Sequence, residues 1–68
     1  MQVASTFDGQ EFLSDVYRGR PIAIHNRFGR WHVYLDHIIQ NKIAFDSSEH
    51  AIAWLMESVD EGRPARVN

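Results

Sequence analysis

Hydrophobic and polar residues alternate through residues 21–36, and this alternation predicts a β-hairpin. A two-residue turn at Phe28-Gly29 matches the apolar residues of the two arms, so that Ile24 lies opposite Val33. Gly29 supplies the positive φ angle that such turns need. A slip of one residue would send each apolar side chain to the wrong face, so we expect this register to be unique. The face it buries consists of Ile22, Ile24, Trp31, Val33 and Leu35.

The opposite face of this hairpin is mostly polar and comprises Ala23, His25, Arg27, Arg30, His32, Tyr34 and Asp36. In the same register His25 lies opposite His32, and Arg27 lies opposite Arg30, which places like charges across the strands. A polar outer face suits a sheet that is covered on one side only. It also suits a surface that docks an anionic partner.

A third strand is expected at residues 42–46, with the sequence KIAFD. A three-residue loop at residues 39–41 pairs Lys42 with Ile38 and sends Ile43 and Phe45 to the buried face. In this register Ile38 faces outward and Ile39 lies in the loop.

The N-terminal segment predicts a short helix that ends at Gly19. Asp8 and Glu11 have the spacing of a capping box, and Arg20-Pro21 prevents the helix from continuing. Its apolar face consists of Phe12, Leu13, Val16 and Tyr17. The position of this helix relative to the sheet is left open.

The C-terminal segment predicts a longer helix that opens at Asp46 or Ser47 and ends at Gly62. Its apolar stripe has helical spacing and consists of Ser48, Ala51, Ile52, Leu55, Met56 and Val59. Trp54 lies off that stripe, so either the N-terminal helix covers it or it is an exposed aromatic of the kind enriched at interfaces.

Together these elements predict a single α+β domain over residues 1–68. It consists of a short N-terminal helix, a three-stranded antiparallel β-meander, and a C-terminal helix packed on one sheet face. The expected core adds Ile43, Phe45, Ile52, Leu55, Met56 and Val59 to the buried face of the hairpin.

The chain has 68 residues and no cysteine, so disulfides and thiolate metal sites are excluded. No apolar run is long enough to span a membrane, and the N-terminus lacks the features of a signal peptide. We therefore expect a cytoplasmic protein that does not contact membranes. Marginal size, two open sheet edges and Trp54 also predict a homodimer.

The charged residues segregate along the chain, although the net charge is only −2. Residues 18–42 contain five basic residues and one acid, whereas residues 46–61 contain five acids and neither lysine nor arginine. Segregation of this kind predicts a bipolar surface.

The sequence offers no catalytic apparatus, and we expect no enzymatic activity and no cofactor. It contains neither a G-x-S-x-G turn nor a glycine-rich phosphate loop. His25 and His32 could approach one ion, with His37 or Asp36 nearby, but zinc needs three or four converging ligands. The two facing histidines could instead act as a pH sensor.

A set of seven residues has the spacing of a known module: Gly29, Trp31, Val33, Phe45, Ser47, Ala51 and Trp54. Over roughly residues 22–60 the chain resembles the arm-type DNA-binding N-terminal domain of phage and transposon tyrosine recombinases. The chain also resembles small phage and bacterial β-β-β-α proteins of unknown function, which have a similar spacing of these residues. The resemblance implies that the outer sheet face reads the DNA major groove through Arg27, Arg30, His32 and Lys42.

Two functions follow from these features. The favoured one is a small non-enzymatic protein-binding module, a regulator or inhibitor encoded by a phage or mobile element, that docks its basic outer face on an acidic surface. The alternative is a nucleic-acid-binding module that uses the same face; its basic residues are few, and nine acids oppose phosphate binding. The expected partner-binding residues are Arg27, Arg30, His32, Tyr34, His25, Lys42 and Trp54.

Overall fold

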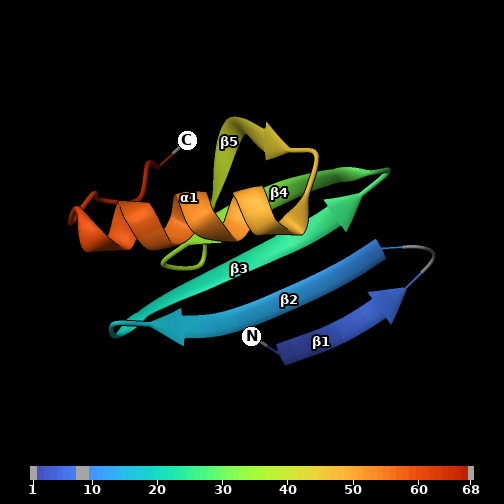
Figure 1. Ribbon diagram of the computed structural model, residues 1–68, viewed down its shortest axis with the longest axis horizontal. Coiled ribbons are helices and arrows are strands. Elements are labelled where there is room, and N and C mark those ends of the chain that lie inside the picture. Colours follow the sequence, from blue (N-terminus) through green and yellow to red (C-terminus); the bar gives the residue numbers. More distant parts are fainter. Residues whose placement is uncertain (1, 8–9, 68) are drawn as a thin grey trace.

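The described residues form a five-stranded antiparallel sheet with a single helix on one of its faces (Figure 1). The structure, a computed structural model, describes residues 2–7 and 10–67, with side chains from residue 11 onward. The elements are β1 (Gln2–Phe7), β2 (Gln10–Tyr17), β3 (Arg20–Arg27), β4 (Arg30–Leu35), β5 (Ile38–Phe45) and α1 (Ser48–Asp60). Each strand pairs with its neighbours in the sequence, so the sheet is a simple meander.

The central hairpin, β3 and β4, has the predicted register. Ile24 pairs with Val33, His25 pairs with His32, and Arg27 pairs with Arg30. The turn residues Phe28 and Gly29 have φ angles of 53° and 81°, as a type I′ turn requires. The Asn26 side chain stabilises this turn, because its Oδ1 accepts a hydrogen bond of 3.1 Å from the Gly29 amide.

The predicted N-terminal helix is wrong, because residues 10–17 form strand β2. Leu13 pairs with Ile24 and Tyr17 pairs with Arg20, so the segment extends the sheet beyond the central hairpin. Strand β1, which was not predicted, pairs with β2 and makes the sheet five-stranded rather than three-stranded. Asp8, the first residue of the predicted capping box, lies outside the described residues.

The predicted loop before the last strand is also wrong. Asp36 and His37 form a two-residue turn with φ angles of 55° and 68°, and β5 begins directly after it. Ile38 therefore pairs with Leu35 rather than with Lys42, and it does not lie on the outer face. The pairing shifts between His32 and Tyr34, where β5 accommodates extra residues in a bulge.

Helix α1 has a defined cap at each end. The Ser47 side chain accepts a hydrogen bond from the His50 amide, which selects Ser47 over Asp46 as the N-cap. At the other end the Arg63 amide bonds to the Ser58 carbonyl, and the Gly62 amide bonds to the Val59 carbonyl. These two bonds form a Schellman motif, and Gly62 supplies its positive φ angle of 69°.

The core lies between α1 and the face of β3, β4 and β5 that it covers. Its buried members are Ile22, Ile24, Val33, Leu35, Ala51, Leu55 and Val59. Half-buried apolar residues pack around them: Leu13, Tyr17, Trp31, Ile43, Phe45, Ile52, Trp54 and Ala65. The predicted core is thus largely confirmed, while Met56 is only half-buried and is not part of this cluster.

Polar contacts fasten the turns and the C-terminal tail to this core. Arg20 binds the Asp36 carboxylate through two hydrogen bonds, of 3.1 and 2.5 Å, and donates a third, of 2.7 Å, to the Arg63 carbonyl. Asp36 therefore belongs to a turn that binds the tail, and it is not part of the predicted outer face. The buried Gln40 side chain accepts from the Arg66 amide at 3.0 Å.

Candidate functional site

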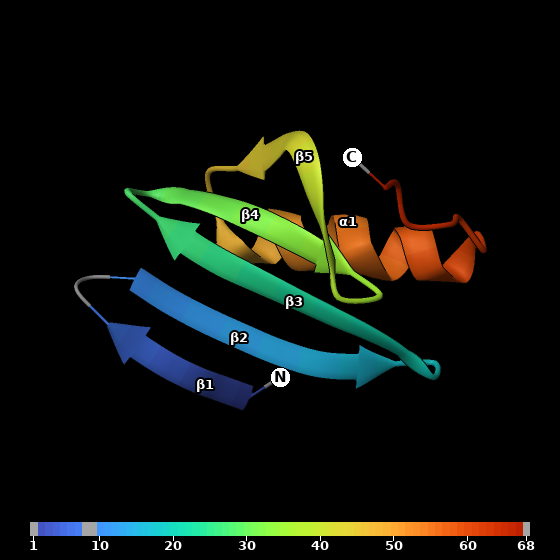
Figure 2. The ribbon, with the colours of Figure 1, turned by 180° about the vertical axis from the view of Figure 1, so that it is seen from behind.

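No helix of the described part of the chain covers the sheet face opposite α1 (Figure 2). We call this surface the outer face. Strand alternation and the observed registers assign to it, among the described side chains, Phe12, Ser14, Val16, Pro21, Ala23, His25, Arg27, Arg30, His32, Tyr34, Ile39 and Ala44. These residues come from four adjacent strands, β2 to β5.

Three rings gather at the centre of the outer face. The Phe12 ring lies 6.1 Å from the Tyr34 ring in an edge-to-face arrangement, and 6.0 Å from the His25 ring. These distances lie within the range in which aromatic rings attract one another. Ala23 lies between Ser14 and Tyr34 in the sheet, and its small side chain leaves space between the larger rings.

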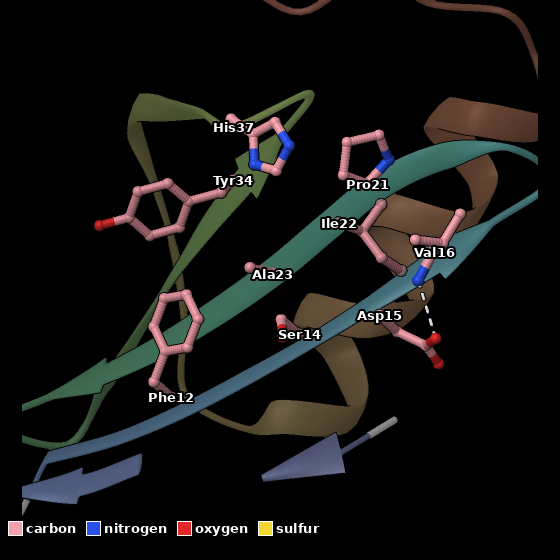
Figure 3. A pocket seen from close by; sticks show the side chains of 9 residues that line it. All are labelled: Phe12, Ser14, Asp15, Val16, Pro21, Ile22, Ala23, Tyr34 and His37. Atoms are coloured by element: carbon pink, nitrogen blue, oxygen red, sulfur yellow. Dashed lines mark hydrogen bonds between the residues drawn. The ribbon is translucent and has the colours of Figure 1, made fainter. Parts of the chain in front are cut away.

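This space forms a shallow groove of about 800 Å³ on the outer face (Figure 3). Phe12 and Tyr34 border it on one side, and Val16 and Pro21 lie toward the other end. Val16 is 64% exposed although it is aliphatic, so its own chain does not bury it. The groove therefore presents apolar and aromatic surface that the fold itself leaves uncovered.

Charge is distributed unevenly around the groove. Among the described side chains, the strand positions of the outer face include no carboxylate. Asp15 lines the groove at its edge, and a hydrogen bond from the Val16 amide lowers the pKa of its carboxyl. Arg27 and Arg30 are exposed at the end of the β3–β4 hairpin, and Arg30 lies 3.8 Å from the exposed Asp46 carboxylate.

The acidic side of α1 is partly neutralised by nearby arginines. Arg63 forms ion pairs with Glu61 at 2.7 Å and with Glu57 at 3.6 Å. Arg18 pairs with Asp60 at 3.2 Å. The segregation of charge in the sequence is therefore weaker in the folded molecule than along the chain.

Five of the seven predicted site residues come together on one side of the molecule. His25, His32 and Tyr34 lie side by side on the outer face, and Arg27 and Arg30 lie at the end of the same strands. Lys42 is exposed on β5, where its φ angle of 69° marks the bulge next to the outer face.

Trp54 is separate from this group, because it lies on α1 on the other side of the sheet. It is half-buried, and its ring lies 6.2 Å from the Phe45 ring. The expectation that an N-terminal helix covers Trp54 is wrong, since that helix does not exist. Phe45 and the core shield Trp54 instead, beside the tail residues Pro64 and Ala65.

The sequence analysis did not identify three apolar residues on the outer face and at the tip of its central hairpin. Phe12 and Val16 were assigned to a helix, although the order Phe12, Ser14, Val16 also fits one face of a strand. Phe28 was assigned only a turn role, yet its side chain is 89% exposed. The exposure of Phe28 could have been suspected from the sequence, because a large aromatic residue occupies a turn position that favours asparagine or glycine.

The described residues offer little for catalysis or metal binding. They include no group of three or more histidine, cysteine or acidic side chains placed to hold a metal ion. Two serines have structural roles, Ser47 at the helix cap and Ser58 in a 2.8 Å hydrogen bond to the Trp54 carbonyl. No described helix is both long enough and apolar enough to span a membrane.

Comparisons of this chain with protein-family models, with curated proteins and with solved structures found no significant match.

Proposed function

We propose that this chain is a non-enzymatic protein-binding module that docks through its outer face. The observation that carries the proposal is the uncovered groove between Phe12 and Tyr34, with exposed arginines at the end of the same strands. Aromatic residues and arginine are the types most enriched among interface hot spots. The groove would take apolar side chains of the partner, and Arg27 and Arg30 would bind carboxylates around them.

A module of this size acts most directly by covering a site on its partner, as a regulator or inhibitor does. Its lack of cysteine suits the reducing cytoplasm, where we place its function. Origin in a phage or mobile element is part of the same proposal, on the strength of the resemblance described above.

Nucleic-acid binding is the second candidate, and one observation favours it. The ring cluster of Phe12, His25 and Tyr34 lies on a face whose described strand positions carry no carboxylate, and bases stack on such rings. Against it stands the small number of cations near that face, Arg27, Arg30 and Lys42, since phosphate binding depends on many.

The test uses the full chain as bait in a lysate of its host, with mass spectrometry to identify partners and titration of the purified partner. The double variant Arg27→Ala, Arg30→Ala keeps the fold, because both residues are exposed beside a turn. We expect it to weaken binding at least tenfold, which corresponds to about 1.4 kcal/mol. Arg66→Ala, which changes an exposed arginine in the tail, is the matched control and should bind normally.

The dependence of binding on salt separates the two candidates. A protein partner gives a modest dependence, whereas nucleic acid gives a steep log-linear one. If the double variant folds normally and binds the purified partner as tightly as the original chain, the outer face is not the docking surface.

A further inference from the structure

Three large apolar side chains are exposed among residues 11–67. Two of them lie at opposite ends of β3, one beside its first residues and one directly after its last. Val16, 64% exposed, pairs with Pro21 at the groove end of the outer face. Phe28, 89% exposed, forms the tip of the β3–β4 hairpin at the far end of β3. The third, Val67, is 82% exposed and lies in the C-terminal tail.

The backbone conformation of Phe28 is a second sign that its exposed side chain has a role outside the fold. Its φ angle of 53° lies in the left-handed region, which is unfavourable for a bulky side chain and is usually occupied here by asparagine, aspartate or glycine. Packing within the chain does not account for a phenylalanine at this position, because the side chain is almost fully exposed. A contact outside the chain would account for it.

The two ends of the outer face complement each other. The groove end carries Val16 and Pro21, whose apolar surface the chain leaves uncovered. The hairpin tip carries an aromatic ring between two exposed cations, Arg27 and Arg30. The uncovered apolar groove at one end therefore matches the exposed aromatic ring at the other end.

We propose that a second copy of this chain packs face to face and antiparallel on the outer face, so that Phe28 of each copy enters the groove of the other. A twofold axis that crosses β3 midway makes this contact twice, as an isologous dimer requires. The ends that must meet, Pro21 and Arg27, are six residues apart on β3, or about 20 Å at ~3.3 Å per residue.

The inference rests on the proposed function, because it names a second copy as a protein that occupies the outer face. It replaces the open sheet edges and Trp54 as the expected site of dimerisation.

Sedimentation velocity over a range of protein concentrations tests the proposal. The original chain should dimerise, and Phe28→Asp and Val16→Asp should each weaken the dimer about tenfold or more. Val67→Asp places the same charge on an equally apolar exposed side chain in the tail, and it should dimerise normally. Circular dichroism of each variant confirms that it remains folded.

A charge swap tests the arrangement itself. In the double variant Val16→Asp, Phe28→Lys, each new lysine faces the new aspartate of the other copy, so the dimer should be stronger than with Val16→Asp alone. A monomeric original chain, a dimer indifferent to Val16→Asp and Phe28→Asp, or a charge swap without recovery overturns the proposal.

The same experiments distinguish failure of the dimer proposal from failure of the proposed function. If the chain is monomeric while Arg27→Ala, Arg30→Ala still weakens binding of the captured partner, the outer face binds that partner and the second copy is excluded. If the chain is monomeric and the double variant binds normally, both proposals fail.

Discussion

Residues other than glycine adopt left-handed backbone conformations at five described positions, and four of these lie in the two-residue turns of the meander. They are Arg18, Phe28, Asp36, His37 and Lys42. Such turns are favoured because their twist matches that of the strands they join. Aspartate and histidine tolerate this conformation comparatively well, whereas phenylalanine does not.

Replacing Phe28 with asparagine should therefore raise the stability of the fold. Phe28→Asn relieves the left-handed strain and creates an Asn-Gly turn, so we expect the free energy of unfolding to rise by about 1 kcal/mol. Urea denaturation at concentrations too low for association measures this. Phe28→Ala removes the same ring without creating a favourable turn residue, so it should change stability less; a fall in stability with asparagine would contradict the argument.

Leu55 is the residue of α1 on which the core depends most clearly. It is fully buried between the helix and the sheet. Leu55→Ala should lower the free energy of unfolding by about 2–5 kcal/mol, through lost burial and the cavity left behind. A loss of that size could unfold a domain this small.

Urea denaturation monitored by tryptophan fluorescence measures the loss. Glu57→Ala, two residues further along α1, removes only an exposed ion pair and should change the free energy of unfolding by less than about 0.5 kcal/mol. Equal effects of the two substitutions would show that the helix does not pack on the sheet as described.

Among the secondary-structure elements, the β3–β4 hairpin was predictable to the residue, and the reason is geometric. Its apolar residues alternate on both arms, and only one register places all of them on the same face. Helix α1 was predictable because a cap, a continuous apolar stripe and Gly62 agree with one another.

The segment at residues 10–17 was not predictable in the same way, because its signals are ambiguous. Phe12, Leu13 and Val16 fit a helical face, but they also fit a strand that buries Leu13 and exposes Phe12 and Val16. Gly19 has a φ angle of 83°, a conformation needed equally at the end of a helix and in a hairpin turn. Pairing with β3 decides between them, and tertiary pairing is not visible in local sequence.

The turn at Asp36 and His37 was missed because neither residue is glycine or asparagine. The prediction placed the turn later, near Asn41, which moved the start of the strand and the side on which Ile38 lies. The bulge in β5 then restores Ile43 and Phe45 to the core, so their burial was correctly predicted from a wrong register.

The contact between Arg20 and Asp36 ties this turn to the rest of the molecule and should make stability sensitive to acid. Hydrogen bonds from Arg20 lower the pKa of the Asp36 carboxyl below its ordinary value of 3.8. A carboxyl with a lowered pKa contributes stability above its unfolded value and loses it as the pH falls through the folded value. Arg20 also holds the tail through the Arg63 carbonyl.

The original chain and Asp36→Asn should therefore differ in their urea midpoints at about pH 6, with the original more stable, and converge at about pH 2. Asp46→Asn, at a far more exposed carboxylate, is the matched control and should show a smaller difference at both values. A gap between the original chain and Asp36→Asn that stays constant over this range would contradict the role of the carboxylate.

Gln40 performs a similar task for the C-terminal tail. Its buried side-chain amide bonds to the Arg66 backbone and thereby holds Ala65 against the core. Gln40→Ala should release the tail, so hydrogen exchange of the Arg66 amide should accelerate. Asn41→Ala, at the exposed neighbouring position, should leave that exchange rate unchanged; an equal acceleration in both variants would contradict the role of Gln40.

At the scale of the whole molecule, the polar part of the candidate site was predictable and the apolar part was not. His25, His32, Tyr34, Arg27 and Arg30 follow from the register of one hairpin. The groove depends on β2, which brings Phe12 and Val16 beside that hairpin, so an error in one element concealed it.

Association through the outer face should also appear in the stability of the molecule. If the folded state dimerises, the thermal midpoint of the original chain should rise with protein concentration by mass action. The midpoint of Val16→Asp should rise less over the same range, while that of Val67→Asp should rise as in the original. Calorimetry at several concentrations measures this, and a constant midpoint for the original chain would contradict dimerisation.

The meander order has a consequence for how the chain matures during synthesis. Each strand pairs with the strand next to it in the sequence, so strands β1 to β5 can pair one after another as they leave the ribosome. The cover for Ile24, Val33 and Leu35 is α1, which emerges last. Until residues 48–60 have left the ribosome, the nascent sheet exposes its most apolar face. The newly made chain therefore stays prone to aggregation until α1 packs on the sheet.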